Sequence, residues 1–127
     1  MKKNILLIAL AVTALSGSAL AQKATRVTFK RGSTSAVLSG RLNSYKGSRV
    51  FLVRVRDGQT LKVEAIKRAV SVWIKGPPGS VEQDLAADCH GNSEITPTTK
   101  GDYKLTVQEC SKADPWKGTF KVRVTVE

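Results

Sequence analysis

The sequence predicts an all-β protein, a single antiparallel β-sandwich of about eight short strands. Apolar and polar residues alternate in period two through most of the chain after residue 22. Turn-forming glycine, proline and aspartate recur between these runs, at intervals of about 8 to 12 residues. No stretch shows a convincing helical period. The 127 residues accommodate one small domain, which we predict over residues 22–127 after a signal peptide at residues 1–21.

The first predicted strand has Val27 and Phe29 on one face, and the second, over residues 36–42, places alternate residues on one face. The third and fourth strands alternate over residues 51–56 and 61–65. The dipeptide Asp57-Gly58 between them is typical of a tight turn, so this pair is the clearest predicted hairpin.

Three further strands complete the predicted sandwich. The strand over residues 70–74 stops at Gly76-Pro77-Pro78-Gly79, because proline cannot donate to a strand ladder and glycine tolerates the turn. Residues 103–107 form the next strand, and residues 120–126 form the last, with Lys121 and Arg123 on its wet face.

The N-terminus has the pattern of a cleavable secretory signal. Lys2 and Lys3 precede an apolar run over residues 5–15, and Ala19-Leu20-Ala21 provides an A-x-A cleavage site before Gln22. The apolar run is short for a membrane span, so we expect no membrane attachment after cleavage. The predicted location is the periplasm.

The exported part is strongly basic. Without Lys2 and Lys3, 19 basic residues remain against 10 acidic ones, a formal charge of +9. Such a charge favours an anionic envelope polymer, a lipid surface or a protein with an acidic cleft, and the predicted compartment makes nucleic acid an unexpected partner. The basic residues are spread along the chain, which also fits an ordinary solvated surface.

Cys89 and Cys110 are the only cysteines, and both lie in the exported part, where disulfides form. We predict one structural bridge between them, worth on the order of 3 kcal/mol in the loop-entropy model. A redox pair usually has C-x-x-C spacing, and a zinc site needs more ligands.

The sequence does not predict an enzyme. His90 is the sole histidine, so no second imidazole is present for acid-base relay or for a histidine zinc site. The acidic residues lack the spacing of a calcium loop, and no serine lies in G-x-S-x-G. We therefore predict a binding protein with no cofactor and no metal.

Several runs, in this order, resemble the periplasmic inhibitors of g-type lysozyme. They are VTFKRGSTSAVLSG from Val27 to Gly40 with a following Tyr45, then Asp57-Gly58-Gln59, Gly76-Pro77, residues 88–91 and residues 101–107. The resemblance spans nearly the whole exported chain. It implies a β-sandwich whose loop residues occlude the peptidoglycan-binding cleft of g-type lysozyme.

The resemblance also implies a set of lysozyme-binding residues. Tyr45 is the expected anchor, since tyrosine supplies a large rigid contact at low entropic cost. Where the inhibitors carry arginines after the strand at residues 101–107, this chain has Lys112, Trp116 and Lys117. The full expected set is Arg41, Tyr45, Lys46, Arg49, Lys112, Trp116 and Lys117.

A second interpretation stays open. The spacing of the glycine and proline turns also resembles the accessory β-sandwiches appended to secreted bacterial peptidases, which implies attachment to an anionic envelope polymer. Stable complex formation with g-type lysozyme, as opposed to binding of purified polymer, separates the two. The oligomeric state and the selectivity among lysozyme types are not predicted.

Overall fold

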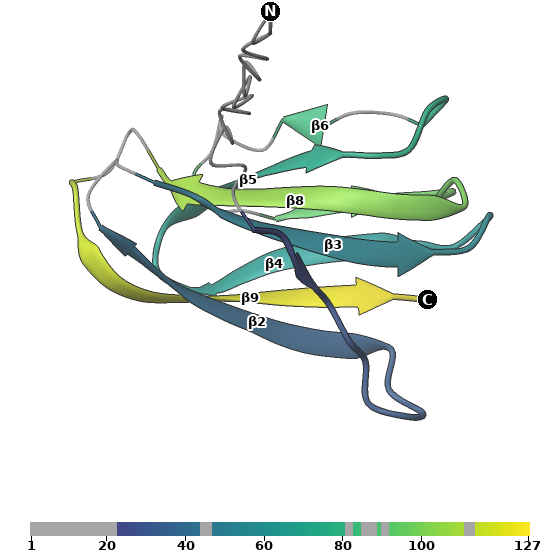
Figure 1. The fold of residues 1–127 in the computed structure, drawn as a ribbon, viewed down its shortest axis with the longest axis horizontal. Coiled ribbons are helices and arrows are strands. Elements are labelled where there is room, and N and C mark those ends of the chain that lie inside the picture. Colours follow the sequence, from purple (N-terminus) through teal and green to yellow (C-terminus); the bar gives the residue numbers. More distant parts are fainter. Residues whose placement is uncertain (1–22, 44–46, 81–82, 85–88, 90–91, 111–113) are drawn as a thin grey trace, which may run out of the picture.

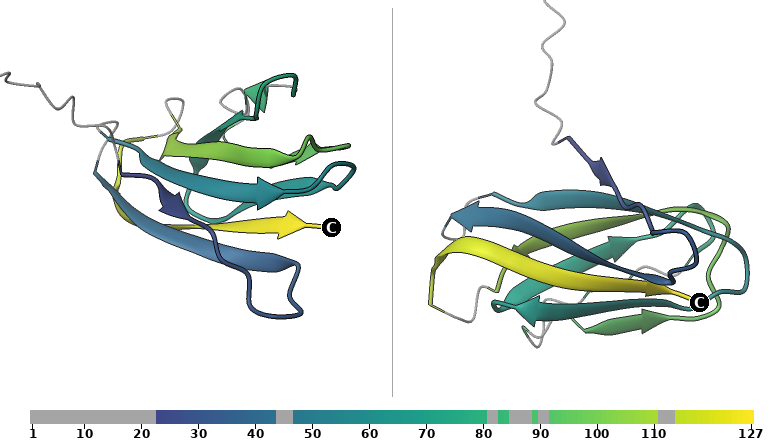
Figure 2. Two further views of the ribbon diagram at one scale, coloured as in Figure 1. Left: turned by 45° about the vertical axis from the view of Figure 1, so that its right-hand side comes forward. Right: turned by 90° about the horizontal axis from the view of Figure 1, so that it is seen from below.

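Two β-sheets pack face to face in a computed structural model of the chain, as Figures 1 and 2 show. The structure describes residues 23–43, 47–80, 83–84, 89, 92–110 and 114–127. The predicted β-sandwich is confirmed, and no helix occurs among the described residues. The predicted signal peptide lies outside them.

One sheet has five strands in the order β1-β3-β8-β5-β6, and the other has four in the order β2-β9-β4-β7. The strands are β1 (Thr25–Arg26), β2 (Ser35–Asn43), β3 (Arg49–Val55), β4 (Leu61–Lys67), β5 (Val70–Lys75), β6 (Gln83–Asp84), β7 (Ser93–Ile95), β8 (Gly101–Glu109) and β9 (Lys117–Val126). The short β6 and β7 were not predicted, because two or three residues carry no readable alternation.

The core lies between the sheets and is built by the alternating apolar residues. On β8, Tyr103, Leu105 and Val107 are fully buried, while the residues between them face outward. Phe120 of β9 is also fully buried and meets the Phe51 ring edge to face, with ring centroids 6.4 Å apart. Aromatic rings from facing sheets therefore interdigitate at the centre of the sandwich.

The predicted hairpin over residues 51–65 is wrong, because β3 and β4 belong to different sheets. Asp57-Gly58 does form a turn, and Gly58 has a positive φ of 76° that suits glycine. The turn instead carries the chain from one sheet to the other. Strands with one apolar face look alike in sequence whether they pair with a neighbour or pack across the core from it.

The predicted first strand is also displaced. The strand is Thr25–Arg26, and it runs parallel to β3, whereas every other pairing is antiparallel. Val27 still donates its amide to the Leu52 carbonyl at 2.8 Å, but Phe29 lies beyond the strand and packs against the core from the β1–β2 connection.

An ion pair fastens β1 to the sheet. Arg26 reaches across β3 to Asp102 of β8 and donates two hydrogen bonds to its carboxylate, at 2.9 and 3.0 Å. These bonds, helped by the Arg26 and Arg54 charges, lower the pKa of Asp102 below its ordinary value. The same pair raises the pKa of Arg26.

The Asp102→Asn variant is therefore expected to loosen β1 while leaving the sandwich folded. Because the pKa of Asp102 is lowered in the fold, the contribution of this pair is present above the unfolded value of about 3.9 and is lost as the pH falls through the folded value. Amide hydrogen exchange at Val27 should be faster in the variant. In the native protein it should rise as the solution is acidified, relative to the exchange of Leu105 in the core.

Candidate binding site

Three chain connections meet at one end of the sandwich, here called the β2–β3 end. They join β2 to β3, β4 to β5 and β8 to β9, and they lie at the left of Figure 1. The strand register places them together, because Asn43 pairs with Lys117 and Val70 pairs with Glu109. The expected lysozyme-binding residues come from the first and third of these connections and from the strands beside them.

Two of the predicted arginines are adjacent. The Nε of Arg49, at the start of β3, donates a hydrogen bond of 3.0 Å to the carbonyl oxygen of Arg41 on β2. This bond spans the two sheets, and both arginines are exposed. The side chain of Arg49 is thereby held against β2, at the backbone of Arg41.

A pocket of about 210 Å³ lies between these arginines and the N-terminal segment. It is lined by Lys23, Thr25, Ser39, Gly40, Arg41, Arg49, Val50 and Phe51. Its charged lining residues are all cationic. Lys23 was not anticipated, because only the fold brings the residues before β1 against β2 and β3.

Gly40 is required by close packing beneath this pocket. A Cβ atom at Gly40 would lie 2.8 Å from two carbons of the Phe120 ring and 3.2 Å from Cγ of Arg49. The regular pairing of Gly40 with Phe120 shows no bulge. The glycine therefore admits both the buried ring and the stem of Arg49.

The Gly40→Ala variant is expected to lose about 1.5 kcal/mol of unfolding free energy, because the Phe120 ring or the Arg49 stem must shift. Urea denaturation measures the loss, and Ser39→Ala on the same strand is the control. An unchanged midpoint would show that the ring moves without cost.

Trp116 and Lys117 stand at the β8–β9 side of the same end. Lys117 is exposed opposite Asn43. Trp116 is partly buried against the core, with the guanidinium of Arg68 over its ring at 5.4 Å from the centroid. Its backbone amide donates to Glu109 Oε1 at 2.7 Å. The Trp116 ring therefore packs against the core at the β2–β3 end, and the guanidinium of Arg68 covers one face of the ring.

Arg68 had no signal in the sequence. It lies in the β4–β5 connection with a φ of +74°, a conformation that is uncommon outside glycine and asparagine. Tyr45, Lys46 and Lys112 lie outside the described residues. Chain connectivity places the first two between Asn43 and Gly47, and Lys112 between Cys110 and Asp114.

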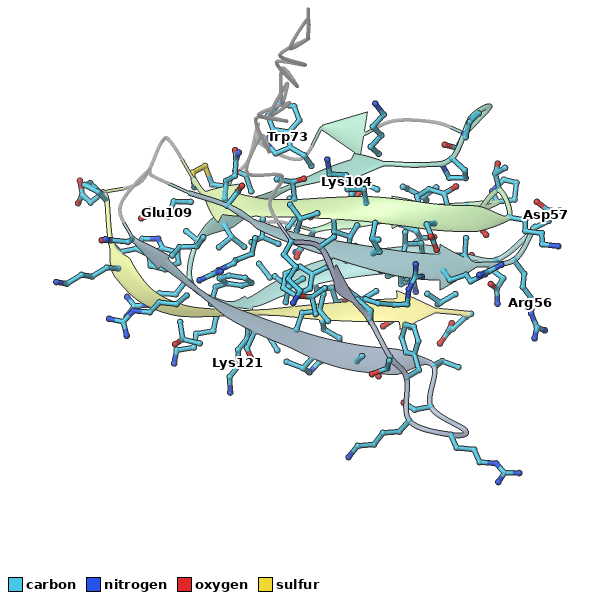
Figure 3. The ribbon with its side chains drawn as sticks, viewed as in Figure 1. Arg56, Asp57, Trp73, Lys104, Glu109 and Lys121 are labelled. Carbon is cyan, nitrogen blue, oxygen red and sulfur yellow. A yellow bond between two sulfur atoms is a disulfide. The ribbon has the colours of Figure 1, made fainter. Side chains whose placement is uncertain are left out.

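The predicted disulfide between Cys89 and Cys110 is confirmed, with Cα atoms 5.2 Å apart. Cys110 is buried at the end of β8, and its amide donates to the Ala69 carbonyl at 3.3 Å. Figure 3 shows the yellow sulfur bond at the β2–β3 end, near the labelled Glu109. The bridge therefore ties residue 89 to the start of the β8–β9 connection.

Neither a metal cluster nor a membrane-spanning helix is found in the described part of the chain. No group of three His, Cys, Asp or Glu residues there could hold an ion. Nor is any helix there long and apolar enough to cross a bilayer. His90 lies outside the described residues, and Asp102 is engaged by Arg26.

Comparison with solved structures identifies the same fold in periplasmic inhibitors of g-type lysozyme. The inhibitor from Salmonella Typhimurium is 24% identical, with a TM-score of 0.62 over 83% of this chain and 98% of the inhibitor. That from Aeromonas hydrophila is 18% identical, with a TM-score of 0.64 over 82% and 96%. A mutant of the Escherichia coli inhibitor is 22% identical, with a TM-score of 0.62 over 84% and 100%.

These three proteins are inhibitors and not enzymes, and this chain shares nearly the whole length of their fold. The resemblance inferred from the sequence is thus confirmed at the level of the fold. No protein-family model matches the sequence. No curated protein sequence matches it either.

Proposed function

We propose that this protein is a periplasmic inhibitor of g-type lysozyme, exported by a signal peptide cleaved after Ala21. The observation that supports it most directly is the gathering of Arg41, Arg49 and Lys117 at the β2–β3 end, next to the connection that contains Tyr45. The fold shared with three such inhibitors supports the same conclusion.

The proposed inhibition needs binding alone. A glycosidase cleft carries a pair of carboxyl groups flanking the bond that it cleaves. Cationic side chains can pair with these groups, while a tyrosine fills the space of a sugar ring. The guanidinium of Arg49 is already positioned by its bond to Arg41, so less side-chain entropy is lost on binding.

Lysis of a peptidoglycan suspension by g-type lysozyme, titrated with the purified protein lacking residues 1–21, tests the proposal. We expect inhibition that is complete near one inhibitor per enzyme, with a complex that survives gel filtration. The c-type and i-type lysozymes serve as comparison enzymes. Retention of the protein by purified peptidoglycan, with no complex and no loss of lysozyme activity, would contradict it and favour the polymer-binding alternative.

Lys117→Ala is expected to raise the inhibition constant several-fold through faster dissociation, because Lys117 lies at the β2–β3 end. Lys121→Ala is the matched control, since Lys121 lies on the same face of β9, four residues further from the β8–β9 connection and opposite Ser39, and should have no effect. A kinetic binding assay at two salt concentrations checks both. Equal damage from the two variants, with a steep fall in association rate on adding salt, would mean that overall charge drives binding.

A further inference from the structure

A second basic pocket lies at the opposite end of the sandwich. It has a volume of about 620 Å³ and opens between the β1–β2 connection and the rim where β3 ends and β8 begins. Figure 3 places the labelled Arg56 and Asp57 at this end, at the right, far from the β2–β3 end. The lining residues are Phe29, Ser33, Thr34, Arg54, Val55, Arg56, Gln59, Lys100 and Val126.

The charge of this pocket is one-sided. Arg54, Arg56 and Lys100 line it, and none of its lining residues is acidic. Arg56 and Lys100 form no ion pair within the part of the chain that the structure describes. The charge of Arg54 acts on the Asp102 carboxylate, which Arg26 contacts directly. At least two cations in the pocket are therefore available to an external anion.

The nearby acidic groups do not neutralise this pair through direct contacts. Asp57 accepts a hydrogen bond from the backbone amide of Lys100 at 2.7 Å, does not line the pocket and forms no ion pair among the described residues. Glu127 exchanges backbone hydrogen bonds with Thr60, at 2.7 and 3.0 Å, and forms no ion pair among the described residues. The Asp57 carboxylate and the Glu127 backbone thus hold the rim of the pocket together.

Hydrogen bonds hold the backbone on both sides of the pocket. Arg56 donates its amide to the Gln59 side chain at 2.8 Å, and its carbonyl accepts the Thr98 hydroxyl at 2.6 Å. On the other wall, Thr34 accepts the Val126 amide at 2.8 Å. The two walls are thus fixed in place, which lowers the cost of ordering them around a ligand.

We propose that this pocket binds an anionic saccharide unit through its carboxylate. Its volume is within the range of small-molecule sites, about 300 to 1,000 Å³, and exceeds what a simple inorganic anion fills. Phe29, Val55 and Val126 offer an apolar wall for the C–H face of a sugar ring, while Ser33, Thr34 and Gln59 line it with polar groups. Arg56 and Lys100 supply the counter-charge to the carboxylate.

The pocket and the β2–β3 end lie at opposite ends of the strands, so both can be occupied at once. The protein could then be held on an acidic glycan while its lysozyme-binding residues stay free. This inference does not depend on the proposed inhibition, because it rests on a different set of residues.

Nuclear magnetic resonance titration with tetragalacturonate at low salt tests it. We expect amide shifts confined to residues 33–34, 56–59 and 98–100, and affinity at least about tenfold weaker when Arg56→Gln is combined with Lys100→Gln. The control combines Lys75→Gln with Lys121→Gln, two exposed lysines outside the pocket, and removes the same charge. The control should bind as the native protein does.

Neutral maltotetraose, inorganic phosphate and tetraglutamate are the comparison ligands. Weaker shifts with all three support an acidic saccharide. Equal loss in the control pair, equal binding of phosphate or tetraglutamate, shifts scattered over the surface, or absence of tetragalacturonate binding would each overturn the proposal. Lysozyme inhibition should be unchanged in Arg56→Gln with Lys100→Gln, and its loss would assign the pocket to the lysozyme contact instead.

Discussion

Replacing Cys89 and Cys110 together by alanine is expected to lower the free energy of unfolding by about 3 kcal/mol, because the bridge restricts the unfolded chain. The bridge joins residues 21 positions apart in sequence, and one of them, Cys110, is buried at the end of β8. Alanine leaves no polar group in that buried position. Urea denaturation of the native and double-alanine proteins, each fitted with its own slope, measures the difference.

The inhibition of g-type lysozyme is expected to change by no more than about twofold in the same variant, since the bridge acts chiefly on the unfolded state. Reduction of the native protein by dithiothreitol should reproduce the stability loss, and it should not affect the double-alanine variant. Full stability together with lost inhibition would reverse the assignment, making the segment around Cys89 part of the contact surface.

Strands with clear alternation could be predicted from the sequence, but the pairing of one strand with another could not. The buried faces of β3, β5, β8 and β9 follow the expected residues, because a half-buried strand needs an apolar residue at every second position. The same pattern does not encode the partner. Asp57-Gly58 is a turn in either topology, so a hairpin and a crossover between sheets were indistinguishable.

The candidate site was partly predictable for a similar reason. Arg41 and Arg49 flank one connection, so their proximity follows from the short chain segment that joins the two consecutive strands. Lys117 comes beside Asn43 only because β9 pairs with β2, a pairing that the sequence did not predict. The second basic pocket is lined by residues from four separate segments, among them Phe29, Arg56, Lys100 and Val126. No local sequence pattern indicates that such distant residues come together.

Tyr45→Ala is expected to weaken inhibition by about 2 kcal/mol, roughly a thirtyfold rise in the inhibition constant. The reason is position as well as residue type. Tyr45 lies between Asn43, the last residue of β2, and the exposed Gly47 and Arg49, in the connection beside which the two arginines gather. A tyrosine with cationic residues on both sides in the sequence suits a cleft that binds sugar rings between carboxylates.

Tyr45→Phe separates the two contributions of this side chain. If the ring supplies most of the contact, the phenylalanine variant should retain inhibition within about threefold, because only one hydrogen-bonding group is lost. The thermal midpoint should stay nearly unchanged in both variants, since the core is already closed by Phe51, Tyr103 and Phe120. Unchanged inhibition in Tyr45→Ala would remove this residue from the interface and transfer the anchoring role to the arginines. A parallel drop in the midpoint would mean that the tyrosine supports the fold, and that its effect on lysozyme is indirect.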